Sequence, residues 1–134
     1  MNKLVLVIMI FLHIVDDFYL QGIFTKLKQK SWWEENCPES RYRFDYKMAL
    51  LEHSFSWSFV VMLPIMVNIV ATGQEDLIQY YLIFFAFNII AHAIIDNAKA
   101  NDRTINLIFD QILHIGQVVL TWCYFFVRHG EIFI

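Results

Sequence analysis

Three histidine and aspartate pairs, each with a spacing of four residues, are the part of this sequence best suited to chemistry. The pairs are His13 with Asp17, His92 with Asp96, and Asp110 with His114. Residues four apart share one face of a helix, so each pair can act as a bidentate chelate or as a hydrogen-bonded couple. All three lie in apolar stretches, where an unpartnered charge costs several kcal/mol. The presence of three such pairs therefore indicates a functional site.

The composition is typical of a membrane protein. Hydrophobic residues make up 58% of the 134 residues, charged residues make up 17%, and mean hydropathy is +0.48. An ordinary soluble domain has roughly 45–50% apolar and about 25% charged residues. The formal charge of -3 is too small to indicate a nucleic-acid partner. Cys37 lies in a polar connection and Cys123 in an apolar run, so we predict neither a disulfide framework nor a zinc finger.

Four segments have the length of about 17–25 residues that a membrane-spanning helix needs. They cover about residues 4–22, 48–71, 77–97 and 105–127 of a single integral membrane domain, 1–134, with a cytoplasmic loop at about 25–47. We therefore predict an all-α, four-helix transmembrane bundle. The first span is the weakest, because its apolar run ends at Leu12. A cleaved signal peptide and a soluble all-helical protein are the alternatives.

Basic residues predict the orientation of these spans. Six of the ten lysines and arginines lie between spans one and two, and two more lie between spans three and four. By the positive-inside rule both connections are cytoplasmic, which puts both termini on the outer side of the membrane. His129 follows the last span and is predicted to be a solvated tail residue.

This orientation places every polar cluster at one depth. The three pairs and His53 all fall in the cytoplasmic half of the spans, whereas the outer halves carry almost no polar residues. A helix with one polar stripe turns that stripe toward its neighbours. We therefore predict one shared intramembrane site. Its predicted metal ligands are His13, Asp17, His53, His92, Asp96, Asp110 and His114.

Imidazole nitrogen and carboxylate oxygen without thiolate form a ligand set suited to Zn, Mn, Fe or Ni. Either two metals lie between the helices, or one metal takes about three or four ligands while the other aspartates orient the histidines. Asp17, Asp96 and Asp110 are the catalytic candidates. The residues predicted to orient the ligands are Asp16, Gln21, Gln111 and Asn88. Lys99 and Arg103 are predicted to receive a phosphate or an anionic lipid headgroup.

Three strings carry a resemblance to a known family. They are His13-Ile-Val-Asp-Asp17-Phe18-Tyr-Leu-Gln21, His92-Ala-Ile-Ile-Asp96-Asn-Ala-Lys99 and Asp110-Gln111-Ile-Leu-His114. In the form H-x-x-x-D-F-x-x-Q, H-x-x-x-D-x-x-K and D-Q-x-x-H, they resemble the signature of small bacterial and phage integral membrane proteins classed only as a domain of unknown function. The resemblance covers nearly the whole chain and implies a four-helix membrane fold, without an established activity. It also implies the cytoplasmic membrane of a bacterium or of a phage-infected host, which would put both termini in the periplasm. Its members often carry a second histidine in span two, where this sequence has Trp57.

The pattern favours a metal-dependent hydrolase in which a metal-activated water attacks a lipid or lipid-linked phosphate at the cytoplasmic interface. Two alternatives stay open. In the first, the protein is a non-catalytic membrane effector whose His/Asp network fixes helix packing. In the second, it is a proton or metal-ion transporter. The predicted partners are the lipid bilayer and an anionic lipid or lipid-linked substrate, and a homo-oligomer is compatible with the pattern.

Overall fold

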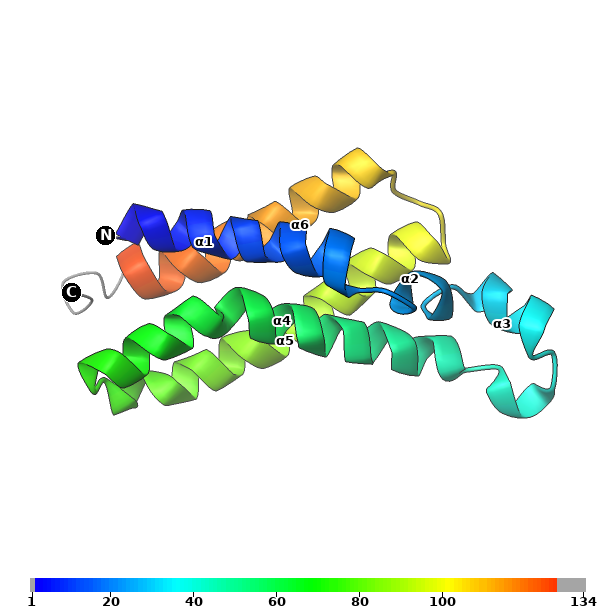
Figure 1. The fold of residues 1–134 in the computed structure, drawn as a ribbon, viewed down its shortest axis with the longest axis horizontal. Helices are drawn as coiled ribbons and strands as arrows, with labels where there is room; N and C mark the ends of the chain where they lie inside the picture. Colours follow the sequence, from blue (N-terminus) through cyan, green and yellow to red (C-terminus); the bar gives the residue numbers. More distant parts are fainter. Residues whose placement is uncertain (1, 128–134) are drawn as a thin grey trace.

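The computed structural model describes residues 2–127, and within that range the chain is all-helical, without a β-strand (Figure 1). The α-helices are α1 (Asn2–Val15), α2 (Phe24–Leu27), α3 (Lys30–Asn36), α4 (Asp45–Thr72), α5 (Ile78–Ala100) and α6 (Leu107–Trp122). Two π-helical turns, Asp16–Leu20 and Cys123–Val127, extend α1 and α6, and 3-10 turns cover Ser40–Tyr42 and Glu75–Leu77. The all-α prediction is confirmed. His129 lies outside the described residues.

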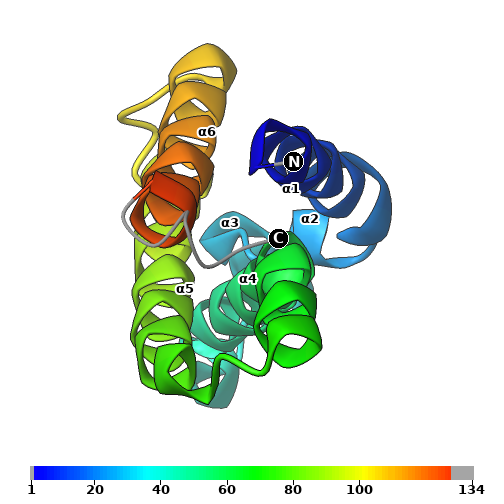
Figure 2. The ribbon, with the colours of Figure 1, turned by 90° about the vertical axis from the view of Figure 1, so that its left-hand side faces the viewer.

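Helices α1, α4, α5 and α6 run alongside one another and enclose the interior (Figure 2). Helix α4 packs against α5 and α1, and α6 packs against the same two helices. The N-terminus and the α4 to α5 turn lie at one end, whereas α2, α3 and the α5 to α6 connection lie at the other (Figure 1). Much of the segment predicted as a loop at about 25–47 is helical, and α2 packs against α4.

Three helical segments are long and apolar enough to cross a membrane: Ser40–Thr72, Glu75–Ala100 and Leu107–Val127. Helix α1 is not one of them. It has only 14 residues, and the π-helical turn that extends it begins with Asp16 and Asp17. The first predicted span therefore stays a prediction.

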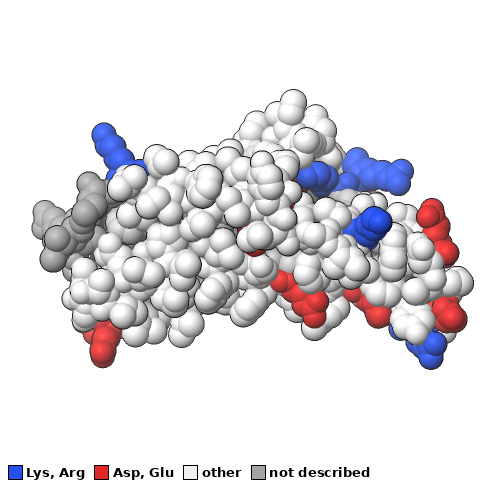
Figure 3. Space-filling view, viewed as in Figure 1, with Lys and Arg blue, Asp and Glu red and all other residues white. Residues whose placement is uncertain are grey.

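The outer surface is apolar along much of the length of these helices. Large side chains such as Val70, Ile94 and Ile108 are 74%, 64% and 71% exposed. Figure 3 shows that charged groups gather toward the end that carries α2 and α3, while most of the face along α1 and α4 is uncharged. Exposed apolar surface of this extent marks a protein or membrane contact in folded chains.

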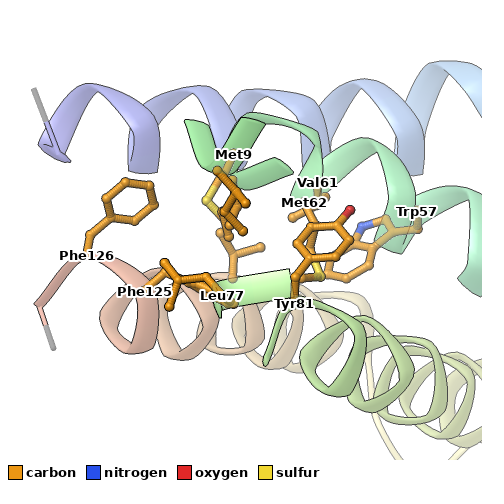
Figure 4. Packing of buried hydrophobic residues seen from close by; sticks show 11 residues of the cluster. Met9, Trp57, Val61, Met62, Leu77, Tyr81, Phe125 and Phe126 are labelled. Carbon is orange, nitrogen blue, oxygen red and sulfur yellow. The ribbon is translucent and has the colours of Figure 1, made fainter. Parts of the chain in front are cut away.

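The interior is divided into an apolar half and a polar half. The apolar half adjoins the N-terminus and the α4 to α5 turn, and Figure 4 shows its packing. It contains Met9, Trp57, Val61, Met62, Ile65, Ile69, Leu77, Tyr81, Val118, Phe125 and Phe126. Trp57 lies where this core meets the polar half. The polar half is nearer α2 and the α5 to α6 connection, and it contains the buried histidines and aspartates of the described residues.

Two local signals end or begin the helices that carry these residues. Helix α4 ends at Thr72, and the φ of +67° at the following Gly73 is left-handed. The amide nitrogens of Gly73 and Gln74 bond to the last carbonyl groups of the helix. Helix α6 begins after Asn106, whose side-chain oxygen accepts a hydrogen bond of 2.9 Å from the Phe109 amide. These caps set where α4 ends and where α6 begins.

Candidate metal centre

Four neighbouring helical segments contribute to one buried group of side chains, which we call the His/Asp cluster. Its members are Asp17 from the π-helical turn after α1, His53 from α4, His92 and Asp96 from α5, and Asp110 and His114 from α6. None of these six residues is more than 4% exposed. The π-helical turn closes with a bond of 3.0 Å from the Gln21 amide to the Asp16 carbonyl, and both of its aspartates are buried. Such turns are frequent at functional sites.

The first group of ligands within the cluster contains two imidazoles and two carboxylates. One ligand atom from each of Asp17, His53, His92 and Asp96 lies within 4.8 Å of the other three. The Nε2 atom of His53 is 3.5 Å from both Asp17 Oδ1 and Asp96 Oδ2. The Nε2 atom of His92 is 3.2 Å from His53 Nε2. This group could hold a metal ion.

The second group contains one imidazole and two carboxylates, and it shares Asp17 with the first. Ligand atoms of Asp17, Asp110 and His114 lie within 4.8 Å of one another. His114 Nε2 is 3.5 Å from Asp110 Oδ1, but the structure gives neither atom a hydrogen-bond partner. Buried polar groups normally have one. The donor set therefore fits a cation that both atoms approach.

Two lysines form short ion pairs with the cluster. Lys28 Nζ lies 2.7 Å from Asp96 Oδ2, and Lys99 Nζ lies 2.7 Å from Asp110 Oδ2. The Lys28 side chain is only 11% exposed, and that of Lys99 is 33% exposed. Lys99 was predicted at this site, although as an anion receptor. Lys28 was missed, because the sequence shows it only as one of several lysines in a polar connection.

Asn101 holds the backbone beside Lys28 in place. Its Nδ2 atom donates a hydrogen bond of 3.0 Å to the Lys28 carbonyl, and its Oδ1 atom accepts one of 2.7 Å from the Lys30 amide. The end of α5 is thereby tied to the segment between α2 and α3. This contact explains how a lysine from a surface connection reaches the interior.

His13 orients the cluster from outside both ligand groups. The indole Nε1 of Trp57 donates a hydrogen bond of 2.9 Å to His13 Nδ1, so the neutral ring carries its proton on Nε2. That nitrogen donates to Gln111 Oε1 at 3.1 Å. The Gln111 Nε2 atom then donates to Asp17 Oδ2 at 2.8 Å and to Asp110 Oδ2 at 3.0 Å. Both ring nitrogens of His13 are used in this chain, which positions two of the carboxylates.

Trp57 also supports the histidine rings from the apolar side. Its ring stacks on His92 with a centroid separation of 4.3 Å, and His92 stacks on His114 at 4.1 Å. Rotation of the His92 ring would disturb both contacts. Trp57 thus belongs to the site as a residue that positions the histidines.

The other predicted orienting residues have different surroundings. Asp16 accepts a hydrogen bond of 3.1 Å from Ser56, and its Oδ2 atom lies 4.0 Å from His53 Nδ1. The side chain of Gln21 donates to the backbone carbonyl of Asp17. Asn88 belongs to a separate polar group with Gln117 and Thr121, with bonds of 2.8 and 3.0 Å.

A cleft of about 360 Å³ opens beside the cluster. Three basic residues, Lys28, Lys99 and Arg103, line it together with Asp96. Arg103 is exposed and has a left-handed φ of 54° in the α5 to α6 connection. The two predicted anion receptors therefore lie on the same cleft, and a cluster carboxylate forms part of its wall.

Comparisons with protein-family models, with curated proteins and with solved structures found no match for this chain.

Proposed function

We propose that this chain is a four-helix integral membrane protein with a metal centre near the cytoplasmic face, and that it hydrolyses a lipid or lipid-linked phosphate. One observation carries the proposal. Buried ligand atoms from four helical segments approach one another within 4.8 Å in two overlapping groups, directly beside a cleft that three basic residues line.

The chemistry of the donors agrees with a hydrolytic centre. Nitrogen and oxygen ligands without sulfur suit Zn, Mn or Fe, and such an ion supplies an activated water and a Lewis acid. Asp17, Asp96 and Asp110 would hold the ion and orient the histidines. Lys99 and Arg103 carry the positive charge that a phosphate group at the cleft requires.

Activity should depend on bound metal. We expect the full chain, purified in detergent without chelator and supplied with MnCl₂, to release phosphate from a dispersed lipid phosphate such as phosphatidic acid. Removal of the metal with a chelator or the His92→Ala change should lower the rate by at least about a hundredfold, since loss of supporting residues alone costs 10–100-fold at metal sites. Phosphate release measured against time tests this. Equal rates with and without chelator would exclude a metal-dependent hydrolase.

The proposed topology has its own test. In a Cys123→Ala protein, Cys37 next to α3 should resist a membrane-impermeant maleimide in intact bacterial cells and react after lysis. The matched probe is Glu75→Cys in a chain without native cysteines, because Glu75 is exposed at the opposite end. It should react in intact cells. Labelling of both positions, or of Cys37 alone, in intact cells would overturn the orientation.

A structural role for the cluster is the second candidate. The Lys28 to Asp96 and Lys99 to Asp110 ion pairs, each 2.7 Å long, partly neutralise the carboxylates within the fold itself. In that case His92→Ala and Asp110→Ala should lower the thermal midpoint of unfolding, and any loss of phosphate release should follow the loss of folded protein. A transporter would need a polar route through the apolar half of the interior, and we do not propose one.

A further inference from the structure

We infer that the His/Asp cluster binds two divalent metal ions, with Asp17 as the carboxylate that both share. The inference rests on the metal binding proposed above and adds the number of ions and the place of each. The first ion is assigned to Asp17, His53, His92 and Asp96, and the second to Asp17, Asp110 and His114.

The number of donors exceeds the needs of one ion. The first group alone supplies the four ligands that a tetrahedral ion takes, and the second supplies the three that a catalytic ion commonly takes. With one ion in the first group, His114 Nε2 would keep only long contacts, 3.5 Å to Asp110 Oδ1 and 3.4 Å to Asp96 Oδ1, and neither it nor Asp110 Oδ1 would have a hydrogen bond, although both side chains are 0% exposed. Such buried groups are destabilising unless something binds them. A second ion accounts for both atoms.

The carboxylates present their two oxygens to opposite sides of the cluster. Asp96 Oδ2 lies 3.5 Å from His53 Nε2, whereas Asp96 Oδ1 lies 3.4 Å from His114 Nε2. Asp17 behaves similarly, with Oδ1 next to His53 and Oδ2 bonded to Gln111, which also contacts Asp110. A carboxylate with one oxygen toward each group is suited to bridging ions about 3.5–4 Å apart, as in two-metal hydrolases. Paired-metal centres of this kind lie between helices in bundle proteins.

The charges accommodate a second ion once an anion binds. Four buried aspartates, Asp16, Asp17, Asp96 and Asp110, and two lysines together leave two negative charges in this part of the interior. One divalent ion balances these charges, and a second adds two positive charges that a phosphate dianion in the cleft would offset. Lys28 and Lys99 line the cleft as well as contacting the cluster, so both would then be free to bind an anionic phosphate there.

Manganese provides the test, because two Mn²⁺ ions this close together give a coupled paramagnetic resonance spectrum that isolated ions do not. We expect the full chain, loaded with MnCl₂ in detergent and then desalted, to retain two Mn per chain and to show the coupled spectrum. Asp110→Asn should retain one ion and lose the coupling. Asp102→Asn changes an exposed aspartate near the same end of the molecule and should behave like the unmodified chain.

The outcomes separate the two proposals. One Mn per chain with an isolated-ion spectrum overturns the two-ion inference and leaves a metal-dependent hydrolase intact. No retained Mn overturns both. Two coupled ions in Asp110→Asn overturn the assignment of the second site. If Asp110→Asn does not fold, His114→Gln removes a different ligand of the same site, and the spectrum of the unmodified chain still decides the number of ions.

Discussion

Replacement of Asp17 by asparagine is expected to remove metal from the whole His/Asp cluster while the protein remains folded. Asp17 belongs to both ligand groups, and its oxygens face His53 on one side and Gln111 on the other. Asparagine has the same shape but carries no charge and presents only one oxygen. We expect metal affinity to fall by at least about a hundredfold, because even loss of residues that only support ligands costs 10–100-fold.

Metal per chain after desalting measures this effect, and thermal unfolding of the metal-free protein measures the fold. The metal-free Asp17→Asn protein should stay folded and unfold close to the temperature of the metal-free unmodified chain, since asparagine keeps the shape of aspartate and retains an oxygen that can accept the Gln111 hydrogen bond. Asp76→Asn is the matched control, because Asp76 is exposed at the opposite end. Unchanged metal content in Asp17→Asn would contradict the assignment. A large loss of stability without metal would favour the structural role instead.

The Lys28→Met change is expected to destabilise the metal-free protein by about 3–5 kcal/mol, the usual effect of removing one partner from a buried ion pair. Asp96 is 1% exposed and would lose its contact with the Lys28 ammonium group. A divalent ion can replace that positive charge. Added Zn²⁺ should therefore raise the thermal midpoint of Lys28→Met more than that of the unmodified chain.

Two further variants sharpen this result. Lys26→Met makes the same change two residues earlier at an exposed position and should leave the midpoint almost unchanged. The double variant Lys28→Met/Asp96→Leu removes the whole pair, so it should recover much of the metal-free stability but lose the response to Zn²⁺. If Lys28→Met unfolds at the same temperature as Lys26→Met, the ion pair contributes no stability. Equal Zn²⁺ responses in all variants would place the ion away from Asp96.

The part of the candidate site that could be predicted from sequence is the relative position of two residues on the same helix. Because the α-helical period places residues four apart on one face, the pairs His92 with Asp96 and Asp110 with His114 point the same way in the structure. The common depth of the polar residues in the apolar segments predicted that the pairs would meet. The structure brings five of the six paired residues into the two ligand groups, together with His53. The sixth, His13, binds Trp57 and Gln111.

The sequence by itself determined the all-helical class, the apolar surface and the choice of imidazole and carboxylate donors, because composition and helical periodicity act locally. Only the tertiary structure decided which groups bind which. Lys28 reaches Asp96 because Asn101, more than seventy residues later, holds its backbone, and Gln111 joins Asp17 to Asp110 across two helices. Contacts of this kind depend on how the helices are rotated and shifted against one another. That arrangement is set by packing among distant residues, which residue spacing along the chain does not specify.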